Sequence, residues 1–256
     1  MFLSLDRTKL YTTAFGAKDA LPILTLSGWI GTWEDWSEVL ALLSEDWRTI
    51  SYDHRGSGAT VAPLETIVYQ QLVEDVFTVL DAYQVRQCVL AAMSMGSLVA
   101  ISALLQQPQR FSGLVIVNGI ASRPVTAEND PFLQGLKRNY PAALRQFIEA
   151  CVPEEDSEHL KRWGRQIVGR AEQEAAVALY RVADGIDLRG DLQRITQPTL
   201  IVHGDADPLV PAAVAQQMAQ AIPNAQLTLL HGAGHVPIIT RPREVAEAIQ
   251  QRFGRP

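Results

Sequence analysis

The chain has 256 residues, of which 47% are hydrophobic and 20% charged, enough apolar material for a sizeable core. Its 22 Lys and Arg residues against 28 Asp and Glu residues give a net charge of −6, so we expect no nucleic-acid partner, which would require a concentrated basic face. The two cysteines, Cys88 and Cys151, are too few for a disulfide framework or a structural zinc site. A globular enzyme or binding protein remains.

The first residues and the apolar runs bear on targeting. Asp6 and Arg7 stand where a secretory signal peptide needs an apolar run. No stretch of the sequence reaches the ~18 uncharged apolar residues of a membrane span. We therefore expect a cytoplasmic protein with no membrane partner.

Short apolar runs that favour strands alternate with longer segments of helical periodicity. An antiparallel edge hairpin is predicted at residues 2–5 and 10–14, and strands at 22–27, 49–53, 88–92, 114–118, 199–203 and 226–230. Helices are predicted at 65–83, 98–107, 210–221 and 244–253. The strand runs are apolar almost throughout, which is typical of burial on both faces of a parallel sheet. This alternation predicts an α/β fold with a mostly parallel central sheet flanked by helices.

One segment interrupts the alternation. Residues 122–192 contain no convincing strand, and Pro124, Pro131, Pro141 and Pro153 divide them into short helical stretches. The strand pattern resumes after this segment, so the strands on both sides belong to one sheet. We interpret residues 122–192 as a helical segment inserted into a single core domain, residues 1–121 and 193–256.

Ser94 lies between a predicted buried strand and a predicted helix, in Ala92-Met93-Ser94-Met95-Gly96. On a tight strand-to-helix turn a serine is forced outward, and the residues two before and two after it must be small because their backbones come close. Ala92 and Gly96 meet that demand. The helix start also offers free N–H groups to a developing oxyanion. The alternative is a serine that only caps the helix.

His235 and Asp207 follow the last two predicted strands. His235 lies in a loop with Gly232 and Gly234, from which it can reach over the carboxyl edge of the sheet as a general base. A carboxylate at Asp207 could orient its imidazole. His231 and Asp205 compete for these two roles. We expect His231 to bond or pack locally, and either aspartate could instead cap the following helix.

A metal site is the alternative for the same region. His203, Asp205, Asp207, His231 and His235 are all metal-ligating residue types. Gly232 and Gly234 disfavour the helix that a two-histidine metal face needs, so we predict no metal.

The order of Ser94, Asp207 and His235, each after its strand, resembles that of the α/β-hydrolase superfamily, and the resemblance covers essentially the whole chain. It implies an oxyanion hole formed by two backbone N–H groups, those of Trp29 and Met95. Trp29 ends Ser27-Gly28-Trp29, where the family has His-Gly-x.

A second turn also matches the family. Asp53-His54-Arg55-Gly56-Ser57-Gly58 has its Asp-x-Arg-Gly-x-Gly pattern. We expect a structural role there, with glycines at positive φ and Arg55 tying loops together, rather than a phosphate-binding loop.

The resemblance further implies that the helical segment is a cap over the site. Trp29, Met93 and Met95 are the expected lining of an apolar acyl site. Five cap aromatics could face the pocket, although for most of them we expect packing between cap and core; they are Phe132, Tyr140, Phe147, Trp163 and Tyr180.

The predicted activity is a serine hydrolase that cleaves small-to-medium carboxylic esters through an acyl-enzyme on Ser94, with no metal and no organic cofactor. A cofactor-free haloperoxidase, a lactonase and a carbon–carbon bond hydrolase are alternatives on the same three residues. A ligand-binding receptor or signalling protein that retains them is the alternative of another class. The partner is a small-molecule ester, and the oligomeric state stays open.

Overall fold

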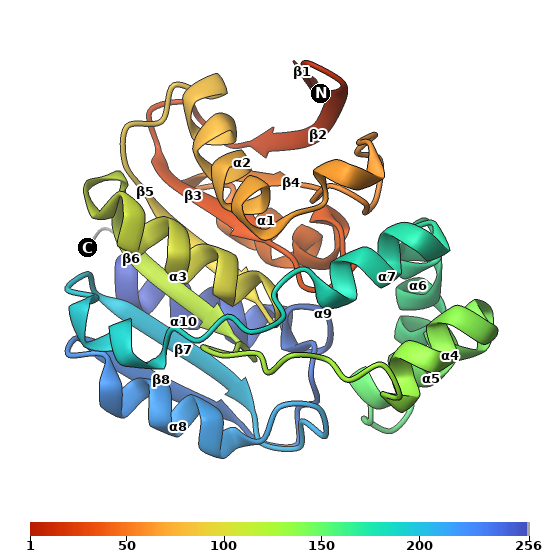
Figure 1. Ribbon diagram of the computed structural model, residues 1–256. Coiled ribbons are helices and arrows are strands. Elements are labelled where there is room, and N and C mark those ends of the chain that lie inside the picture. Colours follow the sequence, from red (N-terminus) through yellow and green to blue (C-terminus); the bar gives the residue numbers. More distant parts are fainter. Residues whose placement is uncertain (255–256) are drawn as a thin grey trace.

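The computed structural model describes residues 1–254, and an eight-stranded sheet runs through them (Figure 1). The strands are β1 (Phe2–Leu5), β2 (Thr8–Phe15), β3 (Leu21–Leu26), β4 (Trp47–Tyr52), β5 (Cys88–Met93), β6 (Phe111–Val117), β7 (Thr199–Gly204) and β8 (Ala225–Leu230). They lie in the order β1-β2-β4-β3-β5-β6-β7-β8. β2 pairs antiparallel with β1 and with β4, and the other pairs are parallel. The predicted mostly parallel sheet with an antiparallel edge hairpin is confirmed.

Helices cover both faces of the sheet. The core helices are α1 (Ser37–Leu43), α2 (Tyr69–Ala82), α3 (Gly96–Gln106), α8 (Ala212–Ala221), α9 (Pro237–Thr240) and α10 (Pro242–Phe253). Apolar residues of α2, α3 and α8 share one buried cluster, and those of α1, α9 and α10 share the other. Short 3₁₀ helices lie at η1 (Trp33–Trp36), η2 (Leu64–Thr66), η3 (Pro108–Arg110) and η4 (Arg189–Arg194). Within residues 1–254, no helix is long and apolar enough to cross a membrane.

Burial follows the position of each strand in the sheet. All residues of β5 and β7 are buried, as expected for strands with helices on both faces. The expectation of two buried faces is wrong for β8, in which Leu229 is 44% exposed. β8 is the last strand of the sheet and pairs only with β7, so its outer side chains reach solvent.

The helical insert lies between β6 and β7 and contains α4 (Pro131–Arg138), α5 (Tyr140–Cys151), α6 (Glu158–Val168) and α7 (Gln173–Arg181). Figure 1 shows these four helices as a group beside the sheet. Pro131 and Pro141 lie in the first turns of α4 and α5, where a missing N–H costs nothing, and Asp130 and Asn139 cap these helices. The insert is as predicted; its boundaries at residues 122 and 192 stay a prediction.

Candidate active site

Ser94 occupies a strained turn between β5 and α3. Its φ is +51°, which is rare for a residue other than glycine, and its N–H donates to the carbonyl of Val117 on β6 at 3.0 Å. A Cβ on Gly96 would collide with the carbonyl oxygen of Ser27, so this position must be glycine. Ala92 is fully buried. The small residues that the sequence places around Ser94 therefore let the turn pack against the neighbouring Ser27 loop.

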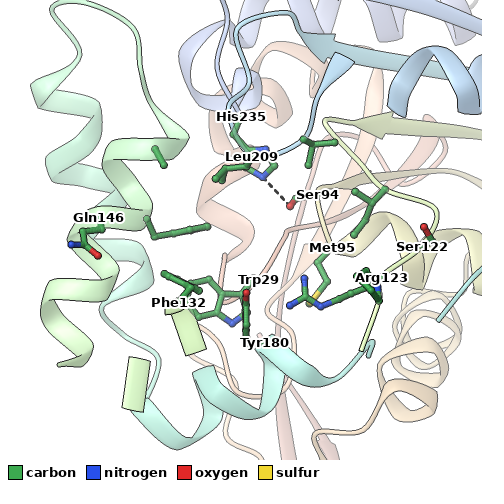
Figure 2. Close-up of a pocket in the computed structure, with 15 residues that line it drawn as sticks. Trp29, Ser94, Met95, Ser122, Arg123, Phe132, Gln146, Tyr180, Leu209 and His235 are labelled. Atoms are coloured by element: carbon green, nitrogen blue, oxygen red, sulfur yellow. Dashed lines mark hydrogen bonds between the residues drawn. The ribbon is translucent and has the colours of Figure 1, made fainter. Parts of the chain in front are cut away.

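A chain of hydrogen bonds joins Ser94, His235 and Asp207. His235 Nε2 lies 2.9 Å from Ser94 Oγ (Figure 2). His235 Nδ1 lies 2.8 Å from Asp207 Oδ2. An ionised carboxylate only accepts hydrogen bonds, so Nδ1–H donates to Asp207 and leaves Nε2 free to accept from the serine hydroxyl. His235 is 2% exposed and Asp207 is 8% exposed. The structure thus brings together three residues from loops far apart in the chain.

Asp207 is held ionised by its hydrogen-bond partners. Burial raises the pKa of this carboxyl, but the bonds from His235, Asn118 and the N–H of Val210 outweigh burial and lower the pKa below its ordinary value. The Val210 N–H donates to Oδ1 at 3.1 Å, and Leu209 N–H donates to the same oxygen at 2.8 Å. A charged Asp207 fixes the imidazole tautomer that the preceding hydrogen bonds require.

Asn118 is a site residue that the sequence reading missed. Its Nδ2 donates to Asp207 Oδ2 at 2.7 Å and to the Gly234 carbonyl at 3.1 Å, and its Oδ1 accepts from Gly204 N–H at 3.2 Å. It therefore connects the loop of the acid to the loop of the histidine. The only signal in the sequence was a polar residue directly after the apolar run of β6. In the structure Asn118 is fully buried and has a φ of +44°.

The residues that competed with His235 and Asp207 in the sequence lie outside this chain of hydrogen bonds. His231 Nδ1 donates to Asp205 Oδ2 at 2.9 Å, and the His231 side chain is fully exposed, which agrees with the local role expected for it. His203 Nε2 donates to the Val210 carbonyl at 2.9 Å, and burial lowers the pKa of its imidazole. In residues 1–254, no group of three or more His, Cys, Asp and Glu side chains is arranged to hold a metal ion.

The loop after β3 lies directly against Ser94. A Cβ on Gly28 would be 3.0 Å from Ser94 Cβ and 3.5 Å from Ser94 Oγ. The N–H groups of Trp29 and Met95, the two expected oxyanion donors, have no acceptor among residues 1–254. An oxyanion hole needs free N–H donors beside the nucleophile, and the role of these two groups stays a prediction.

Side chains behind this loop hold its shape. Ser27 Oγ donates to the Thr32 carbonyl at 2.5 Å, so the serine that replaces the family's histidine still braces the loop. Thr32 N–H in turn donates to Asp35 Oδ2 at 3.1 Å. Burial raises the pKa of Asp35 to about 7, against the lowering effect of that Thr32 bond. Asp35 is a second residue that the sequence reading missed.

Arg55 and its turn have the expected structural role. Arg55 Nε and Nη2 donate to Asp75 on α2 at 2.7 and 2.9 Å, and Nη1 donates to Thr8 on β2 at 2.9 Å. Gly56 and Gly58 take positive φ angles of 83° and 56°. The turn ties the edge hairpin to the helical layer.

A cavity of about 490 Å³ opens between the insert and the core, with Ser94 Oγ and His235 on its wall (Figure 2). Trp29 and Met95 line it as expected, whereas Met93 lines a smaller cavity of about 40 Å³ behind the Trp29 loop. The sequence reading did not place several other lining residues here, among them Ile120, Ser122, Arg123, Pro124, Gln146, Ala150, Leu209 and Val210.

The cap aromatics divide into two groups. Phe132, Phe147 and Tyr180 line the cavity and also pack edge-on against Trp29, with ring centroids 5.3, 4.9 and 5.9 Å from its ring. Tyr140 donates its hydroxyl to the Ala171 carbonyl inside the cap, at 2.8 Å. These three therefore pack between cap and core, as expected for most of the five, and also face the cavity, because Trp29 stands in its wall.

The comparison with known families follows this geometry. A sequence model described as the alpha/beta hydrolase family matches residues 23–248, from β3 to α10. The chain belongs to the alpha/beta hydrolase family. The match spans the sheet, the insert and the loops that carry Ser94, Asp207 and His235, so the alpha/beta hydrolase fold predicted from the sequence is confirmed.

Relatives of this alpha/beta hydrolase include several hydrolases. It is 29% identical over 236 residues to a pimeloyl-[acyl-carrier protein] methyl ester esterase of Nitrosomonas europaea, which covers 87% of this chain and 91% of the relative. It is 27% identical over 249 residues to 3-oxoadipate enol-lactonase 2 of Acinetobacter baylyi, and the match covers 93% of this chain and 92% of the relative. A crystal structure of a hydrolase from Pseudomonas aeruginosa superposes with a TM-score of 0.92 at 25% identity, and the match covers 100% of this chain and 98% of that hydrolase. This alpha/beta hydrolase is therefore a hydrolase with esterase-like and lactonase-like relatives.

Proposed function

We propose that this hydrolase is a serine esterase that cleaves small-to-medium carboxylic esters through an acyl-enzyme on Ser94. The observation that carries the proposal is the pair of hydrogen bonds from His235 to Ser94 and Asp207, at 2.9 and 2.8 Å, on the wall of a mainly apolar cavity. A hydroxyl bonded to an oriented imidazole is an activated nucleophile. Esters of modest size match a cavity of about 490 Å³.

In the acylation step, Ser94 Oγ attacks the ester carbonyl carbon while its proton passes to His235 Nε2. The carbonyl oxygen becomes an oxyanion, and the intermediate collapses as the protonated imidazole gives its proton to the leaving alcohol. Water then attacks the acyl-enzyme with His235 as its base, which releases the acid and restores Ser94. Asp207 stays ionised and orients the imidazole throughout.

The free N–H groups of Trp29 and Met95 are the proposed donors to the oxyanion. Loss of one such donor typically lowers the rate by ~10²–10³, because charge develops where no water replaces the missing bond. Trp29 and Met95 are also the proposed contacts of the acyl group, and Met93 supports them from the smaller cavity behind.

Residues 122–192 are the proposed cap that selects the substrate. They supply Phe132, Phe147 and Tyr180 to the cavity wall. The core residues carry the chemistry, and the cap shapes the space beside them. Localisation in the cytoplasm remains a prediction from the sequence.

Lactones are the second substrate class. A lactone is a cyclic ester, so the same attack by Ser94 opens its ring and leaves the alcohol attached to the acid. The similarity to the Acinetobacter baylyi enol-lactonase over 93% of the chain supports this candidate. Haloperoxidase activity has support of the same kind, because the chain is 28% identical over 240 residues to a putative non-heme chloroperoxidase of Synechocystis. Carbon–carbon bond hydrolysis and a receptor role remain alternatives without an observation of their own.

Covalent labelling tests the proposal. A fluorophosphonate probe should phosphonylate the wild-type protein on Ser94 and leave Ser94→Ala unlabelled, and Ser94→Ala should lose hydrolysis of p-nitrophenyl butyrate. Ser44→Ala, at the end of α1, is the matched control and should label fully. Failure of the wild type to label, or continued labelling of Ser94→Ala, would contradict the serine esterase assignment.

A further inference from the structure

Arg123 is the residue of the cavity wall that carries a permanent charge. No Asp or Glu side chain lines that cavity within residues 1–254. Figure 2 shows the Arg123 side chain extending into the cavity toward Met95 and Tyr180, away from His235. Ser94 and a guanidinium thus share one otherwise mainly apolar space.

The guanidinium is only loosely compensated by protein groups. Arg123 Nε lies 3.6 Å from Asp184 Oδ1, and this buried Nε makes no hydrogen bond with any described residue. Nη2 donates to Thr126 Oγ1 at a long 3.4 Å. Asp184 is already bound by Thr126 at 2.7 Å and by Arg181 at 3.2 Å. Arginine has five N–H donors in a fixed fork, so most of those of Arg123 are left for a ligand.

The position of Arg123 is fixed by backbone and ring contacts. Its N–H donates to the Ile186 carbonyl at 2.8 Å, and its carbonyl accepts from Gly185 N–H at 3.0 Å. The guanidinium carbon lies 4.5 Å from the centroid of the Tyr180 ring. The side chain is 20% exposed. A guanidinium held over an aromatic ring has its position restricted before any anion binds.

We propose that Arg123 binds a carboxylate of the substrate, so that the preferred substrates are esters or lactones that carry a second, free carboxylate away from the scissile bond. The inference rests on the proposed function and specifies its substrate class. A carboxylate matches the planar fork through two parallel N–H···O bonds. One guanidinium balances a single negative charge, whereas a phosphate dianion would need a further cation.

Paired substrates test this inference. The monomethyl and dimethyl esters of glutaric and adipic acid differ in whether a free carboxylate is present, and kcat/KM is measured for each with wild type, Arg123→Met and Arg145→Met. Arg145 lies exposed on α5 and is the matched control for the loss of one cap charge. Arg123→Met should lower kcat/KM for the monomethyl esters by about 10–100-fold, the value of hydrogen bonds to a charged group. The dimethyl esters and Arg145→Met should stay within about threefold of wild type.

The outcomes separate the two proposals. If Arg123→Met lowers kcat/KM for monomethyl and dimethyl esters equally, Arg123 only braces the cap and the inference is overturned. If wild type hydrolyses p-nitrophenyl butyrate and labels with fluorophosphonate but Arg123→Met leaves the ratio of monomethyl to dimethyl ester unchanged, the inference alone fails. If wild type neither labels nor cleaves any ester, the proposed function fails first. Partial recovery of the monoester preference in Arg123→Lys supports recognition of charge.

Discussion

At the scale of single residues, Ser94 is held in a conformation that costs a residue other than glycine about 1–3 kcal/mol. Its φ of +51° is maintained by the bond from its N–H to Val117 and by the fit of Gly96 against the Ser27 loop. The strain directs the hydroxyl toward His235, 2.9 Å away. Such strain is found where a side chain must be presented to a ligand, which agrees with the role proposed for Ser94.

The two aspartates of the loop after β7 form a natural pair of variants. Asp207→Asn keeps the size of the side chain but can stabilise the wrong imidazole tautomer, so we expect kcat for p-nitrophenyl butyrate to fall by about 10⁴-fold, as for other triads. Asp205 bonds only to the exposed His231 and to Gly232 N–H, so Asp205→Asn should keep kcat within about threefold. Equal losses in the two variants would refute the assignment of Asp207.

The buried carboxyl of Asp35 predicts a pH dependence of stability. Its pKa is raised by burial from 3.8 to about 7, so between these values the native state binds a proton that the unfolded chain has lost. The contribution of Asp35 to the free energy of unfolding therefore falls as pH rises through that window, by at most about 1.4 kcal/mol per pH unit. Above pH about 7 the contribution of Asp35 to the free energy of unfolding stays at its lowest value.

Asp35→Asn tests this sign. Asparagine does not titrate and still offers an oxygen to the Thr32 N–H. The free energy of unfolding of Asp35→Asn relative to wild type, from urea denaturation, should therefore increase from pH about 4 to about 7. A difference that stays flat, or that decreases, would show that the pKa of Asp35 is not raised.

At the scale of elements, the turn between β5 and α3 and the loop after β3 work as one packed unit. Gly96 lies against the Ser27 carbonyl, and Gly28 lies against the Ser94 side chain. The free N–H of Met95 comes from the first element and that of Trp29 from the second. The geometry of the proposed oxyanion hole therefore depends on how closely these two backbones approach.

Gly96→Ala is expected to separate the two elements. The new Cβ would meet a backbone oxygen that cannot move aside as a flexible side chain would. We expect a loss of about 1–3 kcal/mol in the free energy of unfolding and a loss of at least about tenfold in kcat. Gly190→Ala, in η4, is the control, because its Cβ would meet no atom within 4 Å. Wild-type kcat in Gly96→Ala would show that close approach is not required.

At the scale of the whole molecule, Trp29 joins the cap to the core. Its backbone belongs to the loop beside Ser94, and its indole N–H donates to the Ala176 carbonyl of α7 at 2.8 Å. Rings from α4, α5 and α7 surround it. Glu34 on η1 also pairs with Arg170 of the cap at 2.6 Å, but such a partly exposed pair adds little. The position of the cap is therefore set mainly by aromatic burial around Trp29.

Two substitutions at Trp29 separate its roles. Trp29→Ala empties the aromatic cluster and should lower the free energy of unfolding by about 3–5 kcal/mol. It should also widen the cavity and shift the preference among p-nitrophenyl esters toward longer acyl chains. Trp29→Phe keeps a ring and loses the indole hydrogen bond, so we expect it to lower the free energy of unfolding by only about 1 kcal/mol. An unchanged acyl-length profile in Trp29→Ala would show that Trp29 does not limit the acyl site.

Much of the fold and part of the site could be predicted from short-range patterns. Apolar runs of strand length and helical periodicity predicted the mostly parallel sheet, because strands buried on both faces are apolar over most of their length. The small residues around Ser94 marked the sharp turn, because that turn has no room for a side chain at Gly96. Asp207 and His235 were predicted because each follows the end of a strand and because glycines flank His235. The structure places both within a chain of hydrogen bonds with Ser94.

Other features depend on contacts between segments that no local pattern relates. Asn118 and Asp35 act through partners that only the folded chain brings to them. The partial exposure of β8 follows from its place at the edge of the sheet.

The sheet, the insert and the order of Ser94, Asp207 and His235 could be predicted from local patterns, because sterics and burial act on neighbouring residues. The contacts of Trp29 with the helices of the insert, and the position of Arg123 in the cavity wall, could be found only in the folded structure. Both depend on how helices of the insert pack over the core, and that packing is set by long-range contacts among aromatic side chains.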